Sequence, residues 1–429
     1  MKNTVNKTNF IFWIAAAVML RVVAMLVAAH SDITFINFFP SKLAYEGIFN
    51  IYGYIEANFP PDRTWAYYPP MTYLTVGGWQ FLFKAFCPGF YQWISKAYFL
   101  GLGEWLVVNG ASFDFFKYLF MMKLPYLFFD MTCLYAILGC VNDSDMKKRA
   151  LKLWVFSPVI LYGVYMFGQV DIFPVTLIMI SILMVKRKKK YAAFLLLSLS
   201  GLFKTFPLFL ILPYLIILTD SRASFWKNIT AVSLPFILIL LPFYLFSGSQ
   251  VINSLFPRFY VVPAEYMFLD VIKKIIFVML YGSLLISCYK MKRALIQSDA
   301  VLLVSIAVLM IIFTLFFTPI HYFVWVTPLL ILAVSMKMIP GWIFWAQIIC
   351  LFIYNLNSSR TTGALFMPLN PQFFTALPGL PDLIHGFSIR WGAVMLGARM
   401  MFTVFCVGVA GAVINKKYFL AHFYRIEEK

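Results

Sequence analysis

Long apolar runs recur along the whole chain and limit what it can fold into. A run of about 20 apolar residues can cross a bilayer as a helix, and the first such run covers residues 10–29. Of the 429 residues, 62% are hydrophobic and 12% are charged, whereas soluble proteins are nearer half apolar and a quarter charged. The sequence therefore predicts an all-α polytopic membrane protein and excludes the soluble, disordered, collagen-like and nucleic-acid-binding classes.

Basic residues between the apolar runs predict the orientation in the membrane. Lysine and arginine number 35, against 17 aspartate and glutamate residues. Short cytoplasmic loops of membrane proteins carry such basic residues, so we place all the clusters, and with them both chain termini, in the cytoplasm. The clusters lie at 147–152, 186–190, 222–227, 290–293, 337 and 416–417.

Hydropathy combined with this orientation predicts about 12 membrane spans. An odd number of the three apolar stretches that precede Lys147 must cross: either 69–86, 93–110 and 115–141 all do, or only 115–141 does. We favour the second, because the first two stretches carry charges and many aromatic residues, as interfacial helices do. This gives a first external loop, 30–114, that contains surface-lying helices. The predicted spans are 10–29, 115–141, 153–168, 172–185, 191–205, 207–219, 228–247, 271–289, 300–317, 322–336, 341–356 and 391–413.

Two polar segments interrupt the short apolar spans in the middle of the chain. They are Gly168-Gln169-Val170-Asp171 and Lys204-Thr205. Interrupted helices often mark a site that faces a cavity, since exposed backbone is tolerated only there. Asp171 could cap the helix that follows it or contribute to a site, and the sequence leaves both open.

Three charged residues stand out by their place relative to the first two spans. Asp32 comes three residues after the first span ends, so it is held at the outer face of the membrane, where a general base would meet a lipid-linked substrate. An ionisable group fixed there is costly without a use or a partner. Arg21 and Asp130 lie inside the first two spans, and we expect them to pair with each other as a structural element.

Cations that face outward are candidates for binding a phosphate. A lysine between two short spans, or a histidine at the outer end of a span, suits a phosphate near the headgroup level. The alternative for each is snorkelling or contact with lipid headgroups. These cations are Lys204, Arg258, His321, Arg360 and Arg390.

Tyr68 lies in the segment Tyr-Tyr-Pro-Pro-Met-Thr-Tyr at 67–73. Two prolines suit the first turn of a helix and tyrosines suit the membrane interface, so this segment is expected to open an interfacial helix.

Other catalytic signatures are lacking in the sequence. The six cysteines lie almost entirely in apolar stretches, without the spacing of a disulfide framework or a zinc site. There is no Walker A, GxSxG or HExxH motif. We therefore expect no cofactor and no metal, although Asp32 and Asp171 could hold one divalent cation if they converge.

Taken in order, these segments resemble one family. They are similar to segments of the GT-C fold integral-membrane glycosyltransferases. The matching segments are the acid after the first span, the Tyr-Pro-Pro helix, the Gly168–Asp171 and Lys204 segments, Leu255-Phe256-Pro257 and His321-Tyr322. These enzymes, including mannosyl- and glucosyltransferases of lipid-linked glycan assembly, use a polyprenyl-phosphate sugar as donor. The resemblance covers residues 10 to about 336. It implies a catalytic-type module, 1–247, followed by a variable module, 248–429.

The resemblance also implies roles for particular residues. Asp32 corresponds to the catalytic acid of the first external loop, and Lys204 and His321 lie near the donor phosphate. Many relatives carry a second acid in this loop, whereas Asp32 has no acidic neighbour, so Glu46 is the candidate for it. The remaining candidates for sugar or acceptor contacts are Gln169, Asp171, Tyr68 and Arg258.

The predicted function is inverting transfer of a hexose from a polyprenyl-phosphate donor to a lipid-linked or envelope glycan acceptor. The site faces the periplasm or the lumen, in a bacterial cytoplasmic membrane or the endoplasmic reticulum. A transporter or lipid flippase is the main alternative, favoured by the short broken spans and the intramembrane charges. The acidic and aromatic residues gather in a long loop on one side of the membrane, whereas a transporter more often has its site at the midplane, and this argues against the alternative. A non-catalytic assembly subunit is the third possibility.

Overall fold

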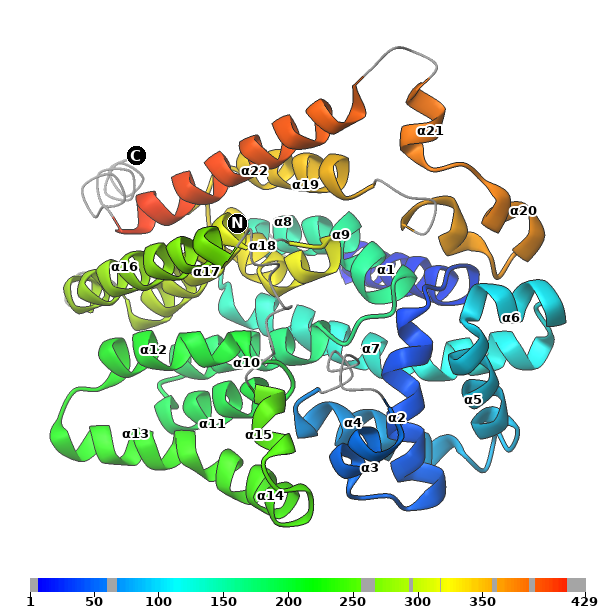
Figure 1. Cartoon of the computed structure of the whole chain (residues 1–429). Helices are drawn as coiled ribbons and strands as arrows, with labels where there is room; N and C mark the ends of the chain where they lie inside the picture. Colours follow the sequence, from blue (N-terminus) through cyan, green and yellow to red (C-terminus); the bar gives the residue numbers. More distant parts are fainter. Residues whose placement is uncertain are drawn as a thin grey trace.

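The computed structural model describes residues 7–59, 68–255, 267–292, 296–316, 318–356, 361–385 and 390–414. Its secondary structure within these ranges is helical throughout (Figure 1). This agrees with the predicted all-α class.

Six of the described helical segments are long and apolar enough to cross a membrane. They are α1 (Lys7–Val27), α7 (Phe113–Cys140), α13 with η4 and α14 (Arg222–Ser247), α16 (Met267–Met291), α17 (Gln297–Leu315) and α22 (Trp391–Ile414). Four shorter apolar segments lie among them: α10 (Ile172–Lys186), α11 (Lys190–Gly201), η3 with α12 (Phe206–Leu218) and α19 (Gly341–Asn355). The chain is therefore a multi-pass membrane protein, while the count of about 12 spans stays a prediction.

The predicted span at 153–168 is broken in the structure. A basic helix, α8 (Ser144–Val155), ends before Ser157, and the chain continues as the short α9 (Pro158–Ile160) and the π-helical η2 (Leu161–Met166). Pro158 has no N–H and pushes the residue before it out of the helical region; Ser157 is extended, with ψ 108°. The prediction of one continuous helix here was wrong. The run is apolar enough for a span, but Pro158 interrupts the helix after Val155.

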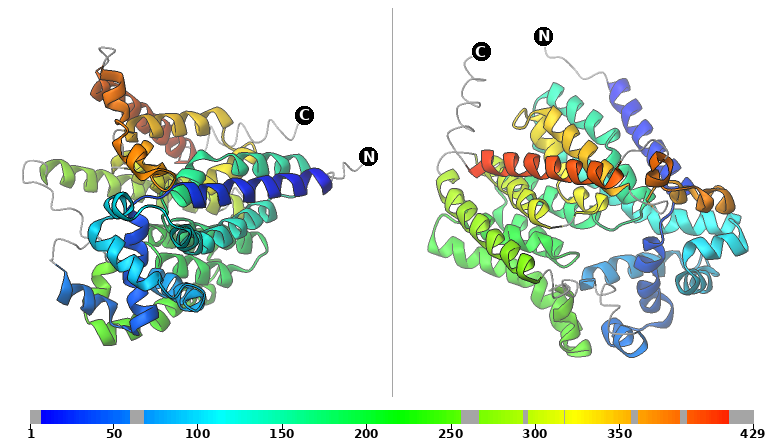
Figure 2. Two further views of the ribbon diagram at one scale, coloured as in Figure 1. Left: turned by 90° about the vertical axis from the view of Figure 1, so that its right-hand side faces the viewer. Right: turned by 45° about the horizontal axis from the view of Figure 1, so that its top comes forward.

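The first external loop folds into its own helical layer. Its helices are α2 (Asp32–Glu46), α3 (Ile51–Asn58), α4 (Pro70–Phe83), α5 (Phe90–Leu100) and α6 (Leu102–Asn109). They lie together at one side of the molecule (Figures 1 and 2). The predicted helix at 69–86 is α4, whereas the one at 93–110 is divided by Gly101, whose φ of 85° requires a glycine.

An aromatic cluster holds this layer together, and hydrogen bonds join it to the bundle. Phe38 of α2 and Tyr98 of α5 stack with ring centroids 4.0 Å apart. At the start of α4, the Thr72 hydroxyl donates to the carbonyl of Phe203 (3.0 Å) and the Met71 N–H to that of Leu202 (3.1 Å). The helix is thereby fixed against the turn that contains Lys204.

The remaining described elements complete the second half of the chain. They are α15 (Gln250–Leu255), η6 (Ile320–Trp325), α18 (Thr327–Ser335), η8 (Gly363–Phe366), α20 (Pro371–Ala376) and α21 (Leu380–His385). One apolar core runs from Ala17 of α1 to Val413 of α22, so helices of both predicted modules share it.

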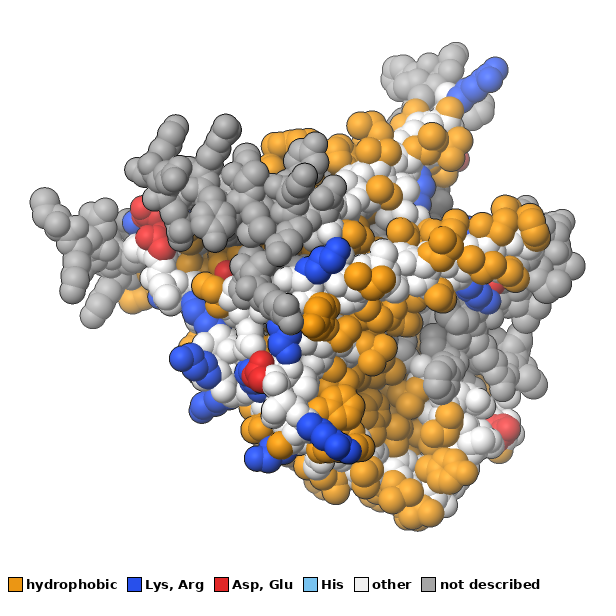
Figure 3. All heavy atoms as spheres, turned by 90° about the vertical axis from the view of Figure 1, so that its left-hand side faces the viewer, with side chains coloured by type: hydrophobic (Ala, Val, Ile, Leu, Met, Phe, Trp, Pro, Cys, Tyr) orange, Lys and Arg blue, Asp and Glu red, His pale blue; other side chains and the backbone are white. Residues whose placement is uncertain are grey.

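The basic loops meet at one end of the bundle. The Lys186 ammonium donates to Asn142 (3.1 Å), Lys190 pairs with Asp220, and Lys292 donates to the carbonyl of Thr219. Figure 3 views the side of the molecule on which Lys and Arg side chains stand beside a broad apolar surface. Gathering of the loops at one end agrees with the predicted orientation, in which they share the cytoplasmic side.

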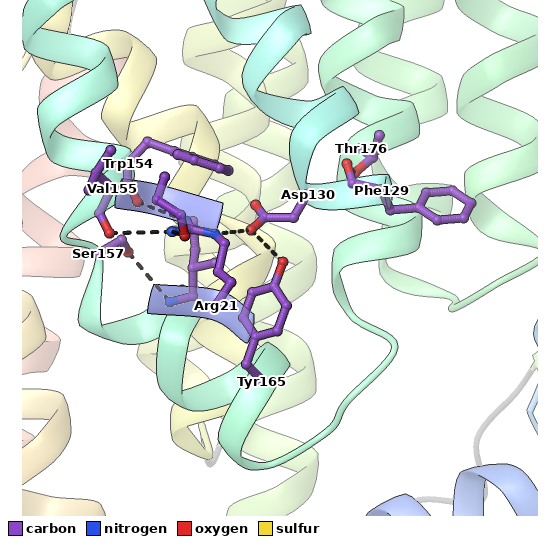
Figure 4. A network of polar contacts seen from close by, with 10 residues as sticks. Arg21, Phe129, Asp130, Trp154, Val155, Ser157, Tyr165 and Thr176 are labelled. Atoms are coloured by element: carbon purple, nitrogen blue, oxygen red, sulfur yellow. Dashed lines mark hydrogen bonds and ion pairs between the residues drawn. The ribbon is translucent and has the colours of Figure 1, made fainter. Parts of the chain in front are cut away.

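Arg21 and Asp130 form a fully buried ion pair, as predicted. The Arg21 Nε lies 2.6 Å from Asp130 Oδ2, and both side chains are 0% exposed. The Tyr165 hydroxyl donates to the same oxygen (2.8 Å), and the Arg21 guanidinium donates to the Trp154 carbonyl (3.1 Å) while stacking on the Trp154 ring (3.7 Å; Figure 4). The pair therefore ties α1, α7, α8 and η2 together.

Replacing one member of this pair should destabilise the protein strongly. Removing a single partner of a buried pair typically costs about 3–5 kcal/mol, because the other charge is left without compensation. We expect Arg21→Met to lower the melting temperature in detergent far more than Lys148→Met, whose ion pair with Asp145 is exposed. The double change Arg21→Met with Asp130→Leu should cost less than Arg21→Met alone. Equal melting temperatures for Arg21→Met and Lys148→Met would refute this role.

Candidate active site

Asp32 is the first residue of α2, directly after the turn that follows α1. Lys123 of α7 fixes this turn: its buried ammonium donates to the carbonyls of Met25 (3.1 Å) and Ala28 (2.5 Å). The Asp32 carboxylate is 36% exposed. Gln169 donates an amide hydrogen to its Oδ2, and His30 Nδ1 lies 3.1 Å from its Oδ1.

These neighbours keep the Asp32 carboxyl ionised. Burial alone would raise its pKa, but the hydrogen bond and charge of His30, the nearby His321 and the Gln169 amide together lower the pKa below its ordinary value. Asp32 is therefore a partly exposed, oriented carboxylate at neutral pH.

The Gly168–Asp171 turn links Asp32 to the rest of the site. Gly168 has a φ of 82°, and a Cβ at this position would lie 3.1 Å from Ile33, the neighbour of Asp32. The Tyr126 hydroxyl donates to the Gly168 carbonyl (3.0 Å). Asp171 occupies the N-cap position of α10, but its side chain accepts no capping hydrogen bond, so the cap interpretation is wrong.

Asp171 instead holds a cation. Its Oδ1 lies 2.6 Å from the Lys204 ammonium and accepts a hydrogen bond from the Trp325 indole (2.6 Å). The rings of Tyr68, Tyr322 and Trp325 surround the ammonium, with centroids 5.8, 5.0 and 5.8 Å from Nζ. Lys204 is 12% exposed, so the structure brings two predicted residues together beside a third, Tyr68.

His321 lies in η6, beside the other groups. Its ring stacks on Phe167 (5.0 Å), whose opposite neighbour is His30 (3.7 Å). Burial lowers the pKa of His321 to about 4, although the Asp171 carboxylate acts in the opposite direction. His321 is therefore neutral at pH 7 and offers a hydrogen-bond donor where the sequence suggested a cation.

The other predicted residues have different surroundings. Burial, with the carboxylate of Asp32, the neighbouring Tyr322 and the carboxylate of Asp171, raises the pKa of Tyr68 well above its ordinary value, so its hydroxyl stays protonated. Glu46 lies at the other end of α2, about 21 Å along the axis at about 1.5 Å per residue, where it pairs with Lys42 (3.1 Å). The structure does not bring it to Asp32. Arg258 lies outside the described residues.

Three residues that contact the site were missed from the sequence. His30 is two positions from Asp32, and that spacing could have drawn attention to it. Trp325 is four residues beyond His321, in a run of aromatic residues that is typical of any membrane interface. Phe167 has no distinguishing signal in the sequence.

Two oxygens of the turn lack hydrogen-bond partners among the described residues. They are Oε1 of Gln169 and Oδ2 of Asp171, on side chains that are 4% and 0% exposed. A buried acceptor without a donor is costly, so both oxygens suit a ligand rich in hydroxyl groups. Within the described part of the chain, no three His, Cys, Asp or Glu side chains are placed to hold a metal ion.

The site can thus deprotonate a hydroxyl at Asp32, accept hydroxyl donors at the turn, and stabilise an anion at Lys204. Residues 105–260 match the model of Glycosyltransferase family 87, which confirms the predicted resemblance to GT-C membrane glycosyltransferases. The matched segment contains the Gly168–Asp171 turn and Lys204. No curated protein matches the chain.

Gly168 should be intolerant of a side chain. Alanine at a φ of 82° is strained by about 1–3 kcal/mol, and its Cβ would press on Ile33. We expect Gly168→Ala to lower the melting temperature in detergent. The matched control is Gly78→Ala in α4, where an added Cβ would have no atom within 4 Å. Equal melting temperatures would show that the turn adapts freely.

Proposed function

We propose, because residues 105–260 match the model of Glycosyltransferase family 87, that the chain is a membrane glycosyltransferase of this kind. It transfers a hexose from a polyprenyl-phosphate donor to a lipid-linked or envelope glycan acceptor, with inversion at the anomeric carbon. The reaction takes place at the external or lumenal face of a bacterial cytoplasmic membrane or the endoplasmic reticulum, and both termini are cytoplasmic.

One observation carries the proposal. The short turn Gly168–Asp171 contacts an exposed carboxylate at one end and a lysine at the other: Gln169 holds Asp32, and Asp171 holds Lys204. Sugar transfer from a phosphate needs a base and an anion-stabilising cation on either side of the anomeric carbon. The turn joins groups of these two kinds.

Asp32 is the base. It accepts the proton of the acceptor hydroxyl as the oxygen bonds to the anomeric carbon, while the bond from that carbon to the phosphate oxygen breaks. Its ionised state and partial exposure suit this step. Gln169 and His30 orient the carboxylate, which matters because a misplaced base loses most of its effect.

Lys204 and His321 stabilise the departing phosphate. Phosphate is already a good leaving group, so no general acid is required. The Lys204 ammonium retains a partly open face and supplies the charge, while His321 supplies a neutral N–H. Tyr68, whose hydroxyl stays protonated, adds a donor next to Lys204.

The donor sugar lies against the turn. Gln169 Oε1 and Asp171 Oδ2 are acceptors without donors among the described residues, and sugar hydroxyls supply donors. Binding the hexose here places its anomeric carbon between Asp32 and Lys204.

The decisive test is transfer of labelled hexose from a panel of polyprenyl-phosphate sugars by purified protein. Asp32→Asn should lower turnover by about 10²–10⁴-fold, the usual contribution of a general base, with an unchanged melting temperature. Asp114→Asn, which changes an exposed acid at the start of α7, should keep full activity. Undiminished turnover in Asp32→Asn would reject Asp32 as the base. No turnover of wild type with any donor, together with movement of lipid or solute in proteoliposomes, would favour a transporter or flippase.

Deoxyfluoro analogues of the accepted donor test the sugar-binding role of the turn. Fluorine keeps the size of a hydroxyl but donates no hydrogen bond, so an analogue altered at a position read by Asp171 or Gln169 leaves a buried acceptor unpaired. We expect kcat/KM to fall by about 10²-fold or more for at least one position. If every analogue is transferred within about threefold of the parent sugar, the turn does not read hydroxyl groups.

A further inference from the structure

His30 contacts the carboxylate of Asp32 and is held rigidly. Its Nδ1 lies 3.1 Å from Asp32 Oδ1. Its ring stacks on Phe167 with centroids 3.7 Å apart and planes 20° from parallel, and the His30 side chain is 15% exposed. The imidazole therefore has one nitrogen fixed on the proposed base.

That nitrogen has a suitable contact in either protonation state. Without a hydrogen, Nδ1 can accept from the backbone N–H of Asp32, 3.2 Å away. With a hydrogen, it can donate to Oδ1. A proton can therefore arrive at Nδ1 without movement of the ring.

The proton taken from the acceptor needs such a place. An aspartate carboxyl holds a proton weakly at neutral pH, and Brønsted behaviour makes it a correspondingly weak base. An imidazole is the stronger proton acceptor of the two side chains.

We propose that His30 receives the acceptor proton from Asp32, so that the two side chains act together as the base. The inference rests on the proposed function. The acceptor O–H bond breaks and an Nδ1–H bond forms on His30, with Asp32 passing the proton between them. The electron pair of the O–H bond forms the glycosidic bond, and the pair of the broken bond leaves on the phosphate. The products are the glycoside, the lipid phosphate and an imidazolium paired with a carboxylate.

The charged and titratable groups around His30 come from several elements. They are Asp32 at the start of α2, His321 of η6 on the far face of Phe167, Lys123 of α7 below the turn, and beyond them Asp171 with Lys204.

The test compares His30→Asn and His30→Ala with wild type in the hexose-transfer assay. Asparagine keeps an N–H donor near the position of Nδ1 but cannot take a proton at neutral pH. We expect both variants to lose about 10²-fold in kcat, with the donor KM within about threefold of the wild-type value.

Two outcomes separate the possible failures. Near wild-type kcat in His30→Asn, with a loss only in His30→Ala, would reject the proton transfer and leave His30 as a residue that orients Asp32. Full activity in Asp32→Asn would instead overturn the proposed function. Melting temperatures in detergent check that each variant is folded.

Discussion

The backbone carbonyls at the ends of helices inside the bundle need donors, and buried or half-buried lysine and arginine side chains supply them. A helix end leaves its last carbonyls unpaired, which is costly away from water. Arg21 donates to the carbonyls of Trp154 and Val155 at the end of α8, Lys123 to those of Met25 and Ala28 at the end of α1, and Arg399 to those of Phe313 and Phe316 at the end of α17. The two arginines also place a positive charge at the negative end of a helix dipole. These helix ends are stable inside the bundle because the three side chains satisfy their carbonyls.

The same buried side chains fix the turns that carry the residues of the candidate site. Lys123 fixes the turn that carries His30 and Asp32, and the Arg21–Asp130 pair fixes η2, whose end leads into Phe167 and Gly168. The proposed catalytic groups lie on the turns where helices break, while the helices themselves give them rigid supports. The candidate site coincides with the helix breaks because an interrupted helix exposes polar backbone and side chains that a ligand can use.

Much of this site could be predicted from the sequence, because its residues stand out against an apolar background. Asp32, Gln169, Asp171, Lys204 and His321 were recognised as polar groups at the ends of apolar runs, and the structure brings them together. Contacts across the bundle could not be predicted in the same way. The Trp325 indole meets Asp171 through packing of η6 against α10, and Phe167, directly after the π-helical η2, stacks with both His30 and His321. The proline at 158 predicts a helix break, but the apolar residues around it favoured a continuous span. Glu46 was misjudged because helix α2, which carries it away from Asp32, was not foreseen.

The far end of the chain also reaches the catalytic turn. The N–H of Ala29, next to His30, donates to the carbonyl of Leu365 in η8 (2.8 Å), and Gly103 of α6 approaches Met367. A ribosome reaches residue 365 only after making more than 300 residues beyond Asp32, which takes roughly 20 s to a minute at about 5–20 residues per second. During that time the turn that carries His30 and Asp32 lacks this hydrogen bond. A chain truncated before Leu365 therefore leaves the turn without its contact to η8.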